Sequence, residues 1–172
     1  KDGTLTDSSF YWAEIIKRRS KKIKNDFLLS KEDYYKLLKV MGLNISTNKL
    51  LPEGPIAIQS RTEVINKIIS HLETKNLQIN NKYLEDIFRN IHSEFSKEAD
   101  KFIVPISPAL QLVKILKNFN VKLFLVTSDT KHNAEKAISF LNINNQFDIV
   151  IGGDSGFGDK KSGRSCQYIC KK

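Results

Sequence analysis

The sequence predicts an α/β fold in which parallel strands carry an inserted block of helices. Two observations support this fold class. Residues 10–103 place apolar side chains at helical spacing, whereas residues 104–172 alternate helical segments with two short apolar runs. Such runs are typical of buried parallel strands, and a helical crossover between them makes the strands parallel. At 172 residues, the chain fits one domain, or one core with a modest insertion.

The chain begins with a polar turn, KDGTLTDSS at 1–9, in which Gly3 lies between Asp2 and Thr4. A turn of this kind normally follows a strand, so we expect it to belong with the strands found later in the sequence. The helical segments would then be an insertion within the core. The expected domains are an α/β core at 1–9 and 104–172 and a helical domain at 10–103.

Four amphipathic helices and no strand are expected in the insertion. The second helix has clear end signals, with Ser30 as its N-cap, Asp33 three residues later and Gly42 just beyond its last turn. The segment LPEGPIAIQS contains two prolines and a glycine and is expected to be a loop. The helices are expected at 10–27, 28–42, 61–76 and 80–100, and the loop at 51–60.

The second part of the chain has the pattern of an α/β fold. A helix with Pro108 in its first turn precedes the strand VKLFLV. The polar residues TSDT then cap another helix, which leads to the strand FDIVIGG and a glycine-rich loop, DSGFGDKKSGR. The helices are expected at 108–120, at 131–142 and from 165 onward, and the strands at 121–126 and 147–153.

Three polar loops are expected at the carboxyl ends of the strands, where open α/β sheets bind their ligands. The opening turn supplies the Asp2 carboxylate and the backbone N–H groups of Gly3 and Thr4. The TSDT loop supplies hydroxyl groups at a helix N-terminus, which favours anions. The glycine-rich loop supplies lysines. A carboxylate, a hydroxyl and a lysine converging on one crevice are typical of a phosphate site. The loop residues are Thr127, Ser128, Lys160 and Lys161.

Three residues outside the clearest pattern are open to more than one interpretation. Ser128 and Asp129 could each contact a substrate or cap the helix that follows. Arg61 follows the proline-rich loop, and an arginine there could bind a carboxylate or phosphate group of a substrate.

The charge of the chain favours anionic small molecules as ligands. Lys and Arg number 28 against 19 Asp and Glu, which gives a net charge of +9. Apart from KRRSKKIK at 17–24, the lysines are scattered, so we expect a solvated surface and no nucleic-acid partner. No apolar run approaches the ~18 residues of a membrane span, and no signal peptide is recognisable.

The two cysteines, Cys166 and Cys170, are spaced to share one face of a helix. They offer too few ligands for a zinc site, and we expect two small buried or half-buried helix residues. Nothing points to an oxidising compartment, so a cytoplasmic location is expected.

Three segments, DGTLTDS, LFLVTSDT and GGDSGFGDKKSG, resemble in order and spacing the first three motifs of the haloacid dehalogenase superfamily. The similarity is greatest to its phosphoglycolate phosphatase-like branch, in which a helical cap lies between the first and second motifs. The resemblance implies a Rossmann-like core at 1–9 and 104–172 and a cap at 10–103.

The resemblance also implies roles for individual residues. Asp2 falls on the second aspartate of the first motif, the general acid and base, whose backbone carbonyl ligates Mg²⁺. Thr127 matches the hydroxyl that binds the phosphoryl group, and Lys160 matches the lysine of the third motif, with Lys161 as the other possible register. The nucleophilic aspartate would precede Lys1, and the fourth motif has no counterpart, so the chain resembles a fragment.

The expected parent protein is a cytoplasmic, Mg²⁺-dependent phosphatase that hydrolyses a small phosphorylated metabolite through an aspartyl-phosphate. The 172 residues themselves are expected to be inactive, because the nucleophile is missing. Two alternatives remain open at this point: a phosphosugar mutase of the same superfamily, and a basic, non-catalytic module that binds nucleic acid or protein.

Overall fold

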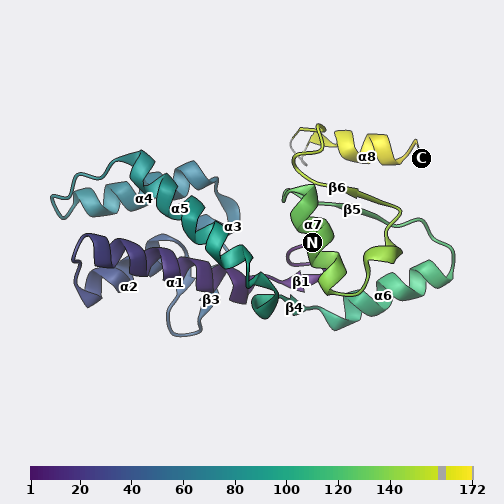
Figure 1. Cartoon of the computed structure of the whole chain (residues 1–172), viewed down its shortest axis with the longest axis horizontal. Helices are drawn as coiled ribbons and strands as arrows, with labels where there is room; N and C mark the ends of the chain where they lie inside the picture. The colour runs from purple at the N-terminus through teal and green to yellow at the C-terminus, as the bar shows by residue number, and fades with distance from the viewer. Residues whose placement is uncertain (159–161, 172) are drawn as a thin grey trace. The chain divides into compact units, whose positions relative to one another are not determined.

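A computed structural model describes residues 1–158 and 162–171 of the chain. The chain forms two compact units (Figure 1). The helical unit is Ser8–Phe102, and the α/β unit combines Lys1–Asp7 with Ile103–Lys172. Each unit has its own apolar core, and each is described by itself below.

The helical unit is a bundle built on α1, which packs against α2 and α5, while α4 packs against α2 and α5. The inner faces of these helices are completely buried at Ile16, Leu37 and Ile68, and Phe88 of α5 belongs to the same apolar core. The elements are α1 (Ser9–Asp26), α2 (Lys31–Val40), α3 (Pro55–Ile58), α4 (Arg61–Glu73), α5 (Asn81–Ser96) and a 3₁₀ turn (Ala99–Phe102).

The predicted helix start at Ser30 is confirmed. Its Oγ accepts a hydrogen bond from the backbone N–H of Asp33, 3.1 Å away, which satisfies one of the donors left free at a helix N-terminus. A full capping box begins α4. Ser60 Oγ accepts from the N–H of Glu63, and the Glu63 carboxylate accepts from the N–H of Ser60.

The prediction of an insertion without strands is wrong at one place. A short antiparallel hairpin joins β2 (Leu43–Asn44) to β3 (Lys49–Leu50). The side chain of Asn44 closes its turn by accepting the backbone N–H groups of the residues at 46 and 47. Gly42 supports the hairpin because a Cβ there would lie 2.8 Å from Gly54 Cα.

The segment expected to be a loop at 51–60 is also partly helical. Pro55 stands at the first position of α3, where a missing N–H costs nothing, and Gly54 is the N-cap.

The α/β unit contains the predicted parallel strands. In β5 (Phe124–Val126) and β6 (Ile149–Ile151), Phe124 lies opposite Ile149, and α7 packs on this pair (Figure 1). The strands are shorter than predicted. The remaining elements are β1 (Thr6–Asp7), β4 (Val104–Pro105), α6 (Ser107–Asn118), α7 (Lys131–Phe140), a 3₁₀ turn (Asn144–Gln146) and α8 (Arg164–Ile169).

Asp148 links the residues that directly precede β5 and β6, and its backbone N–H donates to the carbonyl of Leu123. The Asp148 carboxylate accepts the N–H of Leu123 and lies 3.0 Å from Lys117 Nζ. The opening turn leads into β1, which pairs antiparallel with β4, so that Thr6 lies opposite Pro105 and Asp7 opposite Val104.

The two cysteines lie in α8 and directly after it. Cys166 and Cys170 are both exposed, so the prediction of buried or half-buried side chains is wrong. Helix α8 buries only Ser165, because six residues offer little contact area.

Among the described residues, no helix is both long and apolar enough to cross a membrane.

Candidate functional site

The opening turn presents the side chain of Asp2 on an exposed loop. The carbonyl oxygen of Lys1 accepts the N–H groups of Thr4 and Leu5, at 3.2 and 2.8 Å, which folds the chain back on itself. Gly3 makes this reversal possible, since its φ of +71° is favourable only for glycine. The carbonyl oxygen of Asp2 accepts no hydrogen bond from the described residues and is free to bind a cation.

The loop between β5 and α7 fixes Thr127 at the end of the strand. Its N–H donates to the carbonyl of Ile151, 3.0 Å away, and only 6% of the residue is exposed. Its Oγ1 accepts the N–H of Asp129 at 3.2 Å, so the hydroxyl hydrogen remains available to a ligand. Helix α7 is capped by Thr130, whose Oγ1 accepts the N–H of Asn133.

Ser128 therefore does not serve as the cap of α7. Its side chain is exposed, and its hydroxyl makes no hydrogen bond with the described residues. Of the two roles left open by the sequence, the structure gives the cap to Thr130.

Lys1 and Asp129 join the opening turn to the β5–α7 loop. Lys1 Nζ lies 2.8 Å from Asp2 Oδ1 and 3.2 Å from Asp129 Oδ2, and only 12% of its side chain is exposed. Asp129 is held in turn by the N–H of Thr130 and the side-chain amide of Asn133. The sequence does not predict this link, because nothing local in it pairs residues 1 and 129.

The loop after β6 is hydrogen-bonded to the loop that precedes α7 and to the first residue of α7. Gly153 N–H donates to the carbonyl of Asp129 at 2.7 Å, and Asp154 Oδ1 accepts the N–H of Lys131 at 2.7 Å. The backbones approach so closely that a Cβ on Gly152 would lie 2.1 Å from Lys131 N. All three predicted loops therefore meet at the carboxyl ends of β5 and β6.

The remaining predicted site residues fall elsewhere. Lys160 and Lys161 lie outside the described residues. Arg61 is the first residue of α4 in the helical unit and is exposed. Gly3 and Thr4 are exposed in the opening turn, beside Asp2, but their backbone N–H groups donate to the carbonyl oxygens of Thr6 and Lys1, so the prediction that these groups are available to an anion is wrong.

The described residues supply only part of a magnesium site. The free carbonyl of Asp2 and the carboxylates of Asp2 and Asp129 are oxygen donors of the kind that Mg²⁺ prefers. The ammonium group of Lys1 contacts both carboxylates, however, and no cluster of three or more His, Cys, Asp or Glu occurs among residues 1–158 and 162–171. These residues fit a divalent cation only in combination with further ligands.

Comparisons with known proteins agree with the fold. A sequence model described as haloacid dehalogenase-like hydrolase matches residues 1–172. A protein of Thermotoga maritima assigned as a β-phosphoglucomutase aligns with 92% of this chain at 18% identity and a TM-score of 0.56. A predicted phosphatase from Clostridium acetobutylicum aligns with 99% of the chain at 21% identity and a TM-score of 0.50. A hydrolase from Streptococcus pneumoniae also aligns with 99%, at 14% identity and a TM-score of 0.50.

These solved structures are longer than the chain. The aligned region covers 61% of the Thermotoga protein, 66% of the Clostridium protein and 72% of the Streptococcus protein. No curated protein matches the sequence.

Proposed function

The chain belongs to the haloacid dehalogenase-like hydrolases, and from this premise we propose that it is the greater part of a Mg²⁺-dependent phosphatase. The proposed substrate is a small phosphorylated metabolite, and the helical unit acts as the cap of the enzyme. The observation that carries the proposal is the convergence of Asp2 and Thr127, whose loops are joined through Lys1 and Asp129.

Each residue in this convergence has a proposed role. The Asp2 carboxylate protonates the leaving oxygen and then takes a proton from the attacking water. The Thr127 hydroxyl donates to a phosphoryl oxygen, and the exposed Ser128 hydroxyl offers a further donor. Lys160, or Lys161 in the other register, neutralises charge on the phosphoryl group. When bound, Mg²⁺ would offset the charge of the phosphate, with the Asp2 carbonyl as one ligand.

The covalent step requires a nucleophile that stands two positions before the acid/base in the first motif of the family. Counted from Asp2, that position precedes Lys1. Attack of its carboxylate on phosphorus would break the ester bond and form an aspartyl-phosphate, while Asp2 gives its proton to the departing alkoxide. Water would then cleave the acyl phosphate and return the proton to Asp2.

The test uses the full reading frame that contains these residues, assayed for Mg²⁺-dependent release of phosphate from an aryl phosphate. Replacing Asp2 with Asn should lower kcat at least ~100-fold, the lower limit for a general acid and base. Asp7→Asn, an exposed carboxylate five residues along the same segment, is the matched control and should retain most activity. Full activity of the Asp2 variant would overturn the role of Asp2.

A mutase is the second candidate, because one similar structure is assigned as a β-phosphoglucomutase. A mutase returns the phosphoryl group to a sugar, whereas a phosphatase gives it to water. With a sugar phosphate as substrate, phosphate release at the rate of substrate loss supports the phosphatase, and an isomeric sugar phosphate without phosphate release supports the mutase.

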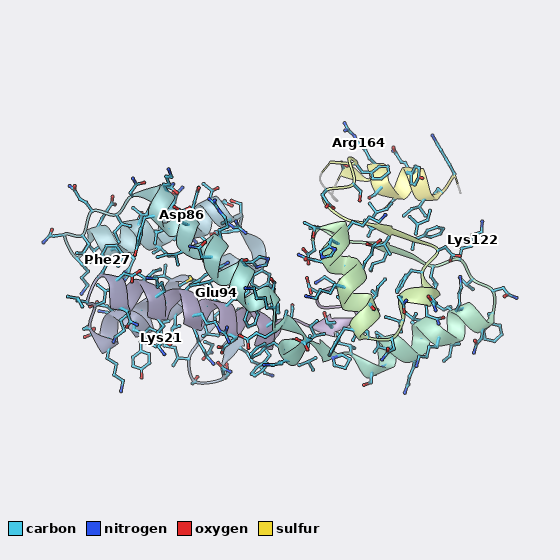
Figure 2. The ribbon with its side chains drawn as sticks, viewed as in Figure 1. Lys21, Phe27, Asp86, Glu94, Lys122 and Arg164 are labelled. Atoms are coloured by element: carbon cyan, nitrogen blue, oxygen red, sulfur yellow. The ribbon has the colours of Figure 1, made fainter. Side chains whose placement is uncertain are left out.

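The basic side chains of residues 17–24 lie in different environments, which argues against a basic binding module. Arg18 pairs with Glu14 and Glu98, Arg19 is buried, and Lys21 is exposed on α1 (Figure 2). The run therefore does not form one cationic face. Salt-dependent binding of duplex DNA without any Mg²⁺-dependent activity of the full protein would favour the module instead.

A further inference from the structure

Arg19, in the middle of α1, is a buried cation without an acceptor. Only 4% of the residue is exposed, and its Nε–H is enclosed and unpaired. Its guanidinium carbon lies 3.8 Å from the centre of the Phe88 ring. Among residues 1–158 and 162–171, the guanidinium makes no hydrogen bond and no ion pair. A guanidinium carries five N–H donors, and none of the five donates to a described residue.

The neighbouring Arg18 on α1 differs from Arg19, because it is paired with two carboxylates. Arg18 Nε lies 3.0 Å from Glu14 Oε1, and its Nη1 contacts Glu98, although a third of its side chain is exposed. The more deeply buried arginine is thus the one without a carboxylate. This arrangement is opposite to the usual pattern, in which buried charges are paired.

A second arginine increases the positive charge around Arg19. Burial and then the charge of Arg61 lower the pKa of Arg19 to about 9. The side chain therefore remains protonated at neutral pH. Arg61 begins α4, and it also makes no hydrogen bond or ion pair with the described residues. The oxygen of the Gln59 side chain, two residues before Arg61, is likewise buried and unpaired.

Stacking on Phe88 does not compensate for this burial. A guanidinium that leaves water without gaining an acceptor destabilises the folded state, and the attraction of one aromatic ring offsets only part of that cost. An anion bound against Arg19 would supply the missing acceptors and would be attracted by both arginines.

We propose that the helical unit binds a small oxyanion, a phosphate or carboxylate group, through the guanidinium of Arg19 with Arg61 as the second positive charge. The planar N–H groups of Arg19 match the oxygens of such a group, and Phe88 holds the guanidinium plane in place. Binding here requires no turnover, so it does not depend on the proposed phosphatase activity.

The test measures binding to the 172-residue chain. Inorganic phosphate is titrated into protein labelled with ¹⁵N, and the Nε–H signal of Arg19 is followed together with the backbone amides of α1 and α4. Arg19→Met keeps an apolar contact with Phe88 and removes the charge. Arg89→Met is the matched control, because it removes an arginine of the same unit whose side chain is 68% exposed.

We expect saturable shifts of the Arg19 Nε–H signal in the wild type and in the Arg89 variant. In Arg19→Met, the amide shifts of α1 and α4 should be lost and the affinity lowered at least ~10-fold, as when a charged hydrogen-bond partner is removed. The thermal midpoint gives a second readout. Without anion, Arg19→Met should melt at or above the wild-type temperature, because an unpaired charge has been removed.

Two phosphate esters, compared with inorganic phosphate, show whether the bound anion is a free ion or part of a substrate-sized ester. If 4-carboxyphenyl phosphate shifts the Arg19 signal while phenyl phosphate and inorganic phosphate do not, the bound group belongs to a substrate-sized ester. If inorganic phosphate suffices, the site takes a free anion. Either result supports the proposal. An Arg19 signal that none of the three ligands moves would overturn it, as would an Arg19→Met variant that melts well below the wild type in anion-free buffer.

Discussion

The close approach of β6 to the start of α7 makes Gly152 the position where one methyl group should cause the greatest damage to the candidate site. In Gly152→Ala, the new Cβ would lie 2.1 Å from Lys131 N, 2.6 Å from Asp154 Oδ1 and 2.7 Å from Lys131 Cα. Two of these atoms belong to the backbone, so no rotation of a side chain can relieve the clash.

The size of the expected loss in stability depends on how far the segments at Gly152 and Lys131 must move apart. Real Cβ atoms essentially never approach other heavy atoms within 3.0 Å, so the two segments must separate by most of an ångström. Overpacking of this kind costs ~1–3 kcal/mol. Separation also breaks the 2.7 Å hydrogen bond from Lys131 N to the Asp154 carboxylate. A hydrogen bond to a charged group contributes ~1.5–3 kcal/mol, which brings the total to about 2.5–6 kcal/mol.

Urea unfolding followed by two probes measures this loss. The single tryptophan, Trp12, reports on the helical unit, and hydrogen exchange of residues 121–158 reports on the α/β unit. We expect Gly152→Ala to lose protection at 121–158 while the Trp12 transition stays in place. Gly156→Ala is the control, because nothing lies within 4 Å of its Cβ and only its φ of +82° is unfavourable, at ~1–2 kcal/mol. Equal losses in the two variants would refute the reasoning.

Three further predictions concern the helical unit. Ser60→Ala removes the N-cap of α4 and should cost ~1 kcal/mol in urea unfolding; an unchanged midpoint would contradict the capping box. Phe88→Ala should cost ~3–5 kcal/mol, since the ring is 1% exposed, and a loss below ~1 kcal/mol would mean that the core closes around the gap. Hydrogen bonds from Ser30 and then Lys75 lower the pKa of Asp33 from 3.8 to about 2. The folded state therefore holds this carboxylate ionised more readily than the unfolded state, so its contribution is present above pH 4 and is lost as the pH falls towards 2. In Asp33→Asn, the urea midpoint should vary less between pH 5 and pH 2, and an identical pH profile would show that Asp33 contributes nothing.

The parts of the fold that the sequence predicted are those determined over short distances. The N-cap at Ser30 needs only Asp33, three residues away, and the start of α6 needs only Pro108. The apolar strands β5 and β6 and the helical insertion follow from periodicity, which is also local. The order of the three loops then predicted that Asp2 and Thr127 belong to one site, and their loops do meet in the α/β unit.

The features that were missed depend on residues far apart in the chain. The β2–β3 hairpin needs Gly42 and Gly54 to touch, and the site needs an ion pair between Lys1 and Asp129. Neither contact leaves a periodic signal in the sequence. The exposure of Cys166 was also unpredictable from its residue type, because burial depends on what packs against α8.

The pairing of β1 with β4 has a consequence for how such a protein can be rebuilt. Asp7 and Val104 are direct cross-strand partners, so the chain leaves the α/β unit and returns to it at neighbouring positions. Directly opposite residues of an antiparallel pair lie only ~4.5–5.5 Å apart, a gap that a two-residue turn such as Asn-Gly can close. The whole helical unit could thus be exchanged for another module, or replaced by a tight turn, without moving either strand.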